Sequence, residues 1–201
     1  MLEVILHGLL LGFGLILPLG AQNMFVFNQG ASQPTYVKAL PVVITAILCD
    51  TALILMAVLG VSLVVLTFSW LQTLLYGLGM LFLLYMGILF WRNQPGKGEA
   101  RQAGIAGKQI WFALSVSLMN PHAIMDTIGV IGINSLNYAA EERWVFTISI
   151  IAVSAVWFFG LAFAGRQVGK RDVQGRLTGR LNKVSALIMW GLAIYMGSQL
   201  L

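Results

Sequence analysis

The feature that most constrains this chain is a series of apolar stretches, each about as long as a helix that crosses a lipid bilayer. A helix needs about 20 predominantly apolar residues to span the hydrocarbon core of a membrane. Six stretches of this kind lie at residues 4–27, 40–66, 70–91, 110–133, 144–164 and 184–201. The sequence therefore predicts an all-α membrane protein with six transmembrane helices. Because Met1, Leu2 and Glu3 provide no basic segment, we expect the first stretch to be retained as a spanning helix rather than removed as a signal peptide.

The composition agrees with a membrane location. Of the 201 residues, 59% are hydrophobic and only 9% are charged, whereas soluble domains carry about 25% charged residues. A soluble domain of this length could not bury so much apolar surface, so lipid must surround most of the chain. The single cysteine, Cys49, excludes an intrachain disulfide and a Cys-x-x-Cys redox pair.

The basic residues gather in the loops that follow the third and fifth stretches. The first of these loops contains Arg92, Lys97, Arg101 and Lys108, and the second contains Arg166, Lys170, Arg171, Arg176, Arg180 and Lys183. Short loops rich in Lys and Arg stay in the cytoplasm. We therefore expect both termini outside and a multi-pass protein in the bacterial cytoplasmic membrane. A basic patch for nucleic acid or anionic lipid is the less favoured interpretation, and we expect no nucleic-acid partner.

A short motif occurs once in each half of the chain. The tripeptide Tyr-Met-Gly stands at residues 85–87 and again at 195–197, in the third and sixth stretches. The first stretch of each half contains a proline, Pro18 or Pro121. These features predict two repeats of three helices, at about 1–92 and 109–201, joined by a cytoplasmic linker at 93–108. Three helices per repeat make the second copy inverted, an architecture common in transporters, although a chance tripeptide match is the alternative.

The first stretch is predicted to be a broken helix. Pro18 has no amide hydrogen and clashes with the carbonyl of Gly14, so a helix bends or opens there. Gly20 permits non-helical backbone, and Gln22 and Asn23 follow with polar side chains. Lipid cannot satisfy a freed carbonyl, so such a break must face protein or a wet cavity. A simple packing kink is the alternative for either proline taken alone.

The fourth stretch has a corresponding break with more polar side chains. Pro121 frees the carbonyl of Ser117, and Asn120, His122 and Asp126 lie nearby. His122 and Asp126 are one helical turn apart and would share a face. Two breaks in corresponding helices, each flanked by amides, favour a binding site.

Two carboxylates lie within the apolar stretches, Asp50 in the second and Asp126 in the fourth. A carboxylate inside the bilayer costs at least about 2.5–3.5 kcal/mol by insertion scales and is normally paired or functional. The interiors of the six stretches contain no Lys or Arg. The missing cation could be a proton, a metal ion, or the ammonium or guanidinium of a substrate. Protonated carboxyls bonded to neighbouring side chains are the alternative. We assign no role to His7.

In these residues the chain resembles the LysE/ArgO family of amino-acid exporters. The resemblance is carried by residues 17–23 (Leu-Pro-Leu-Gly-Ala-Gln-Asn), 25–30, 120–127 (Asn-Pro-His-Ala-Ile-Met-Asp-Thr) and 157–160. It implies export of L-arginine or L-lysine by alternating access, driven by the membrane potential or a proton gradient. Ala21 departs from the family, which usually has a second proline there, and so do Ile124 and Met125.

The expected site therefore combines the two breaks and the first carboxylate. Its members are Pro18, Gly20, Gln22, Asn23, Asp50, Asn120, Pro121, His122 and Asp126. Export of a divalent metal ion or of neutral amino acids on the same scaffold is the alternative. An intramembrane aspartyl protease would need its sequence motifs around the two carboxylates, which this chain lacks, so we expect no enzyme. We assign no cofactor and no resident metal, and the sequence leaves proton coupling and a homo-oligomer open.

Overall fold

The computed structural model describes residues 1–17, 20–60, 69–92, 106–118, 127–172 and 176–198, and these contain helices and connections but no β-strand. The helices are α1 (Leu2–Ile16), α2 (Ala21–Ser32), α3 (Tyr36–Val58), α5 (Ser69–Arg92), α7 (Ala106–Leu118), the π-helix η1 (Thr127–Gly132), α9 (Ile133–Ser135), α10 (Ala140–Arg171) and α11 (Arg176–Ser198). The prediction of an all-α protein is confirmed for these residues.

The helices follow the apolar stretches, but several of them extend further. Within the described part of the chain, α3 and α10 are long and apolar enough to cross a membrane, and α1 with α2 would make a third span if the bent pair counts as one. α5 includes an apolar helix over Gly77–Arg92. α10 and α11 run well beyond the predicted 144–164 and 184–201 at their basic ends, because hydropathy finds the part of a helix in lipid and not its whole length. The six-span arrangement remains a prediction.

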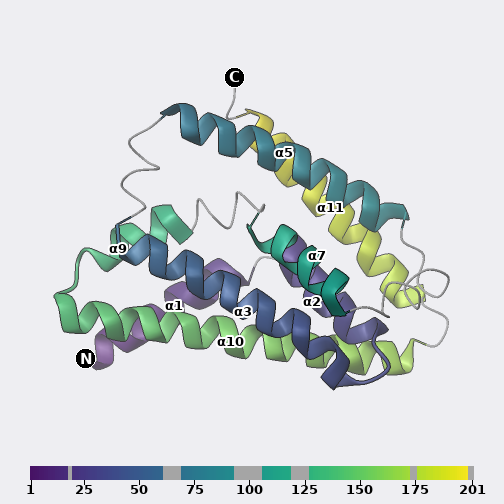
Figure 1. The fold of residues 1–201 in the computed structure, drawn as a ribbon, viewed down its shortest axis with the longest axis horizontal. Coiled ribbons are helices and arrows are strands. Elements are labelled where there is room, and N and C mark those ends of the chain that lie inside the picture. The colour runs from purple at the N-terminus through teal and green to yellow at the C-terminus, as the bar shows by residue number, and fades with distance from the viewer. Residues whose placement is uncertain (18–19, 61–68, 93–105, 119–126, 173–175, 199–201) are drawn as a thin grey trace.

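α10 is the main packing partner of the first three helices. It contacts α1, α2 and α3, while α3 also contacts α7 and η1. α5 packs along α11; Figure 1 shows this pair along one side of the molecule and α1, α3 and α10 along the other, with α2 and α7 between them. The larger buried apolar cluster contains residues of α2, α3, α5, α7, α10 and α11, so one core joins both sides.

The contact between α2 and α10 depends on small residues. A Cβ atom built on Gly30 would lie 2.1 Å from the carbonyl oxygen of Ala162, and one built on Gly165 would lie 2.1 Å from that of Phe27. Gly169 makes a third approach of this kind. Small residues let helix backbones approach closely in membranes, where association relies on van der Waals packing. The short helix α2 is thereby held directly against the backbone of α10.

The basic end of α10 also fixes the connection between α2 and α3. The Arg166 guanidinium donates to the carbonyl oxygens of Gln33, at 2.9 Å, and Pro34, at 2.5 Å. These carbonyls follow the end of α2, where no helical amide is left to satisfy them. The contact brings this connection to the basic end of α10, as expected if both lie on the cytoplasmic side.

Candidate functional site: a carboxylate beside a broken helix

The first predicted break is present. α1 ends at Ile16 and α2 begins at Ala21, and the axes of the two helices differ by 80°. Gly20 is the N-cap of α2 and has an extended backbone (φ −71°, ψ −179°). The Asn23 side chain donates to the carbonyl oxygen of Ile16 at 2.7 Å, which satisfies one of the carbonyls left free where α1 ends. Pro18, to which the break was attributed, lies outside the described residues.

Asp50 meets the beginning of α2. Its Oδ1 accepts a hydrogen bond from the Gln22 side-chain amide at 3.0 Å, and its Oδ2 accepts one from the Ser154 hydroxyl at 2.8 Å. Gln22 and Ser154 are buried, whereas Asp50 is partly exposed. Three helices therefore converge on one carboxylate, since Gln22 belongs to α2, Asp50 to α3 and Ser154 to α10.

These two contacts bring no countercharge to Asp50. Both donors are uncharged, and among the described residues no Lys, Arg or His is within hydrogen-bonding distance of this carboxylate. Neutral donors orient a carboxylate but leave its negative charge in place. A site of this kind can receive a proton or the cationic group of a substrate. In the part of the chain that the structure describes, no three His, Cys, Asp or Glu side chains gather as they would around a metal ion.

The second predicted break falls on undescribed residues. Asn120, Pro121, His122 and Asp126 are all outside the described ranges, so their contribution to the site stays a prediction. The flanking helices are described: α7 ends at Leu118, η1 begins at Thr127, and both pack against α3. π-helices are rare and often occur at functional sites. The helix that carries Asp50 thus contacts the described segments on either side of the second predicted break.

Sequence reasoning missed Ser154. A single serine in a membrane helix is unremarkable in sequence, because its hydroxyl usually bonds the carbonyl four residues earlier. Only the packing of α10 on α3 brings it to Asp50, which is 104 residues away. Sequence reasoning also gave His7 no partner, yet its Nδ1 lies 2.5 Å from the Tyr138 hydroxyl, and its ring lies against that of Phe146.

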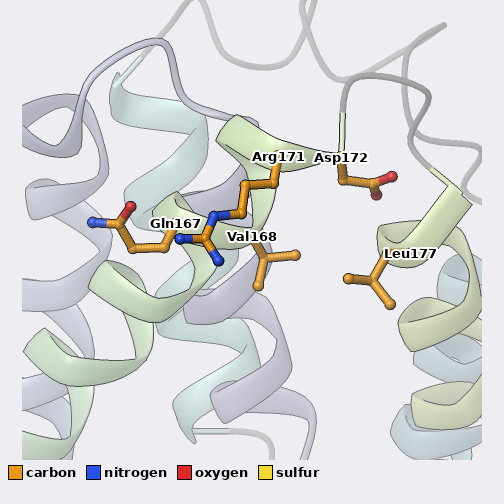
Figure 2. A pocket seen from close by; sticks show the side chains of 5 residues that line it. All are labelled: Gln167, Val168, Arg171, Asp172 and Leu177. Carbon is orange, nitrogen blue, oxygen red and sulfur yellow. The ribbon is translucent and has the colours of Figure 1, made fainter.

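A separate cavity of about 300 Å³ lies where α10 ends and α11 begins. Figure 2 shows its lining side chains, which are Gln167, Val168, Arg171, Asp172 and Leu177. Asp172 Oδ2 accepts hydrogen bonds from the Thr178 backbone N–H, at 2.7 Å, and hydroxyl, at 2.9 Å. These bonds, that of the backbone N–H above all, hold the pKa of the Asp172 carboxyl below its usual value. This cavity shares no lining residue with the Asp50 site.

A helix broken inside an apolar chain, with a carboxylate beside the break, is typical of membrane transporters that bind substrates at interrupted helices. Comparison with known families gives the particular assignment: the model of the LysE type translocator family matches residues 13–200. The chain belongs to this family and is an integral membrane protein.

Similar proteins extend over nearly the whole chain. The candidate amino-acid transporter YisU of Bacillus subtilis (strain 168) is 49% identical over 200 residues, covering 99% of this chain and 91% of YisU. The arginine exporter protein ArgO of Escherichia coli (strain K12) is 31% identical and covers 94% of this chain and 90% of its own length. ArgO of Klebsiella pneumoniae (strain 342) is 32% identical over 96% of this chain and 92% of its own length. No solved structure matches this chain significantly.

Proposed function

We propose that this protein exports basic amino acids, L-arginine or L-lysine or both, from the cytoplasm by alternating access, driven by the membrane potential or a proton gradient. The observation that carries the proposal is the Asp50 carboxylate, which is partly exposed and held by two uncharged donors. A cationic side chain would supply the missing charge. The relatives named as arginine exporters support this choice of substrate.

The break between α1 and α2 supplies a second recognition element, which is positively charged whereas a carboxylate is negative. The first amides of a helix carry partial positive charge and attract anions. Those of α2 begin at Ala21, next to Gln22, which contacts Asp50. We place the substrate carboxylate at this helix terminus and its cationic group at Asp50. Asn120, Pro121, His122 and Asp126, together with Pro18, would complete the site from the two breaks.

Alternating access would use two inverted repeats, and the packing of α5 on α11 supports such repeats. The two Tyr-Met-Gly motifs stand 110 positions apart in these helices. A Cβ atom on Gly87 would meet the Trp190 ring at 2.2 Å, and one on Gly197 would meet the Met80 sulfur at 3.0 Å. Met80 and Trp190 are also 110 positions apart, so the two contacts are equivalent under the repeat.

The second helices of the two halves, α3 and α10, also have buried residues that correspond at a constant spacing. Both begin at positions 104 residues apart, and seven of the ten buried residues of α3 have a buried counterpart at that spacing in α10. The pairs are Val42 with Phe146, Val43 with Thr147, Thr45 with Ser149, Ala46 with Ile150, Cys49 with Val153, Ile54 with Phe158 and Val58 with Ala162. Asp50 and Ser154 have the same spacing of 104 residues, and they bond to each other.

The proposal is tested by transport in proteoliposomes. Purified protein is reconstituted with labelled arginine or lysine trapped inside, and efflux is recorded under an imposed potential or pH gradient. We expect Asp50→Asn, which keeps the shape and removes the charge, to reduce efflux to the level of empty liposomes. The matched control is Glu141→Gln, at an exposed carboxylate near the start of α10. Full efflux by Asp50→Asn, or a wild type that moves neither amino acid, would refute the proposal.

A further inference from the structure

Ser154 differs from the other buried hydroxyl residues of α3 and α10. Thr45, Thr147 and Ser149 each donate to the carbonyl four residues earlier in their own helix, at 2.7 to 2.8 Å. A hydroxyl in a membrane helix usually makes this contact, which gives the hydroxyl a hydrogen-bond acceptor within its own helix. Ser154 instead donates its single proton across to α3, to Oδ2 of Asp50. Ser154 is itself buried, at 3% exposed.

We propose that Ser154 is a specificity-determining residue that fixes the plane of the Asp50 carboxylate and thereby favours a guanidinium over an ammonium group. The inference rests on the proposed function and names the substrate preference of the same site. It concerns a positioning role, because Ser154 acts through Asp50.

The argument starts from the number of lone pairs. A carboxylate has about four acceptor positions, two on each oxygen. Gln22 occupies one on Oδ1 and Ser154 occupies one on Oδ2. One acceptor position remains on each oxygen, and two donors anchored in different helices fix the orientation of the group. The carboxylate therefore presents two acceptors in a defined plane.

Guanidinium and ammonium groups use such an acceptor pair differently. A guanidinium is planar and donates two parallel N–H bonds to both oxygens of a carboxylate, so it depends on the orientation of the carboxylate plane. An ammonium is a compact charge with rotatable donors and needs only a nearby oxygen. Loss of the Ser154 hydroxyl frees the carboxylate to rotate. That change should weaken recognition of arginine more than that of lysine.

The test compares efflux of arginine and lysine at subsaturating concentrations in proteoliposomes, for wild type, Ser154→Thr and Ser154→Val. Thr and Val have nearly the same shape and differ in the hydroxyl, so any added crowding is common to both. We expect Ser154→Val to lower the arginine-to-lysine ratio of Vmax/KM by about tenfold, as for one hydrogen bond to a charged group. Ser154→Thr should stay within about twofold of wild type.

Ser149→Ala provides the control for a general defect in α10, because Ser149 is buried on the same helix and bonds its own backbone. A purely structural role for Ser154 would lower both transport rates equally, and an unchanged ratio in Ser154→Val would overturn the inference while leaving the proposed function in place. An equal shift of the ratio in Ser149→Ala would also overturn it. A wild type that moves neither amino acid would instead overturn the proposed function, and this inference with it.

Discussion

Replacing Gly165 with alanine should weaken the packing of α2 on α10. The new methyl would lie 2.1 Å from the carbonyl oxygen of Phe27 and 3.1 Å from the backbone nitrogen of Ala31. Non-bonded atoms settle near 3.5 Å, so α2 would have to move away by roughly 1 Å. Both opposing atoms belong to the backbone and cannot turn aside as a side chain does. Overpacking of this kind costs about 1–3 kcal/mol.

The cost is measured by equilibrium unfolding of the purified protein in mixed detergent micelles, with Gly160→Ala as the matched control. Gly160 lies on the same helix, and nothing is within 4 Å of a Cβ built on it. We expect Gly165→Ala to lose about 1–3 kcal/mol and Gly160→Ala to be unchanged or slightly more stable, because alanine favours helix. Since α2 carries Gln22, the Gly165 variant should also transport more slowly. Equal stability of the two variants would refute the close-packing argument.

Two further predictions concern other parts of the fold. Gly87→Ala should destabilise the α5–α11 contact, but by less than Gly165→Ala destabilises the α2–α10 contact, because its methyl would lie 2.2 Å from the ring of Trp190, a side chain that can turn aside. Gly77→Ala, with nothing within 4 Å of the new methyl, should cause no loss, and the same unfolding assay compares the variants. The lowered pKa of Asp172 means that its ionised form stabilises the folded protein. This contribution to the free energy of unfolding is fully present above the ordinary pKa of an Asp, about 3.9. It is lost as the pH falls through the lower pKa of the folded state. Melting temperatures between pH 2 and 6 should show this loss in wild type but not in Asp172→Asn, whose side chain at this position does not titrate. Identical pH profiles of the two proteins would contradict the prediction.

The positions of the helices could be predicted from the sequence because lipid imposes a strict local rule. Backbone polar groups in the bilayer must be satisfied within their own helix, so each long helix coincides with an apolar stretch. The ends were less predictable: α10 begins at Ala140 and continues to Arg171, since charged residues can extend a helix once it has left the lipid. The interruption between Ile16 and Ala21 was predictable from Pro18 and Gly20, because those residues act on the local backbone.

The candidate site was predictable only at residues that are unfavourable in an apolar helix whatever their neighbours are. Asp50 is conspicuous because a carboxylate in an apolar stretch is expensive, and Gln22 because it follows a break. Nothing in the sequence pairs these two side chains, yet the fold joins them at 3.0 Å. Ser154 could not be predicted, because a serine costs little in a membrane helix and its contact with Asp50 depends on packing between distant helices.

The proposed repeat explains why the site needs a serine opposite the aspartate. In an inverted repeat, equivalent positions of the two second helices meet near the symmetry axis, and Asp50 and Ser154 are such positions. A symmetric sequence would place two carboxylates face to face at the 2.8 Å now spanned by the hydrogen bond. Two carboxylates sharing a site cannot both ionise, so one would retain a proton and bind the other. A hydroxyl at the second position removes that competition and leaves a single carboxylate to meet the substrate. If the two repeats and the site are as proposed, the divergence of the repeats at this position converts a symmetric helix crossing into a cation site.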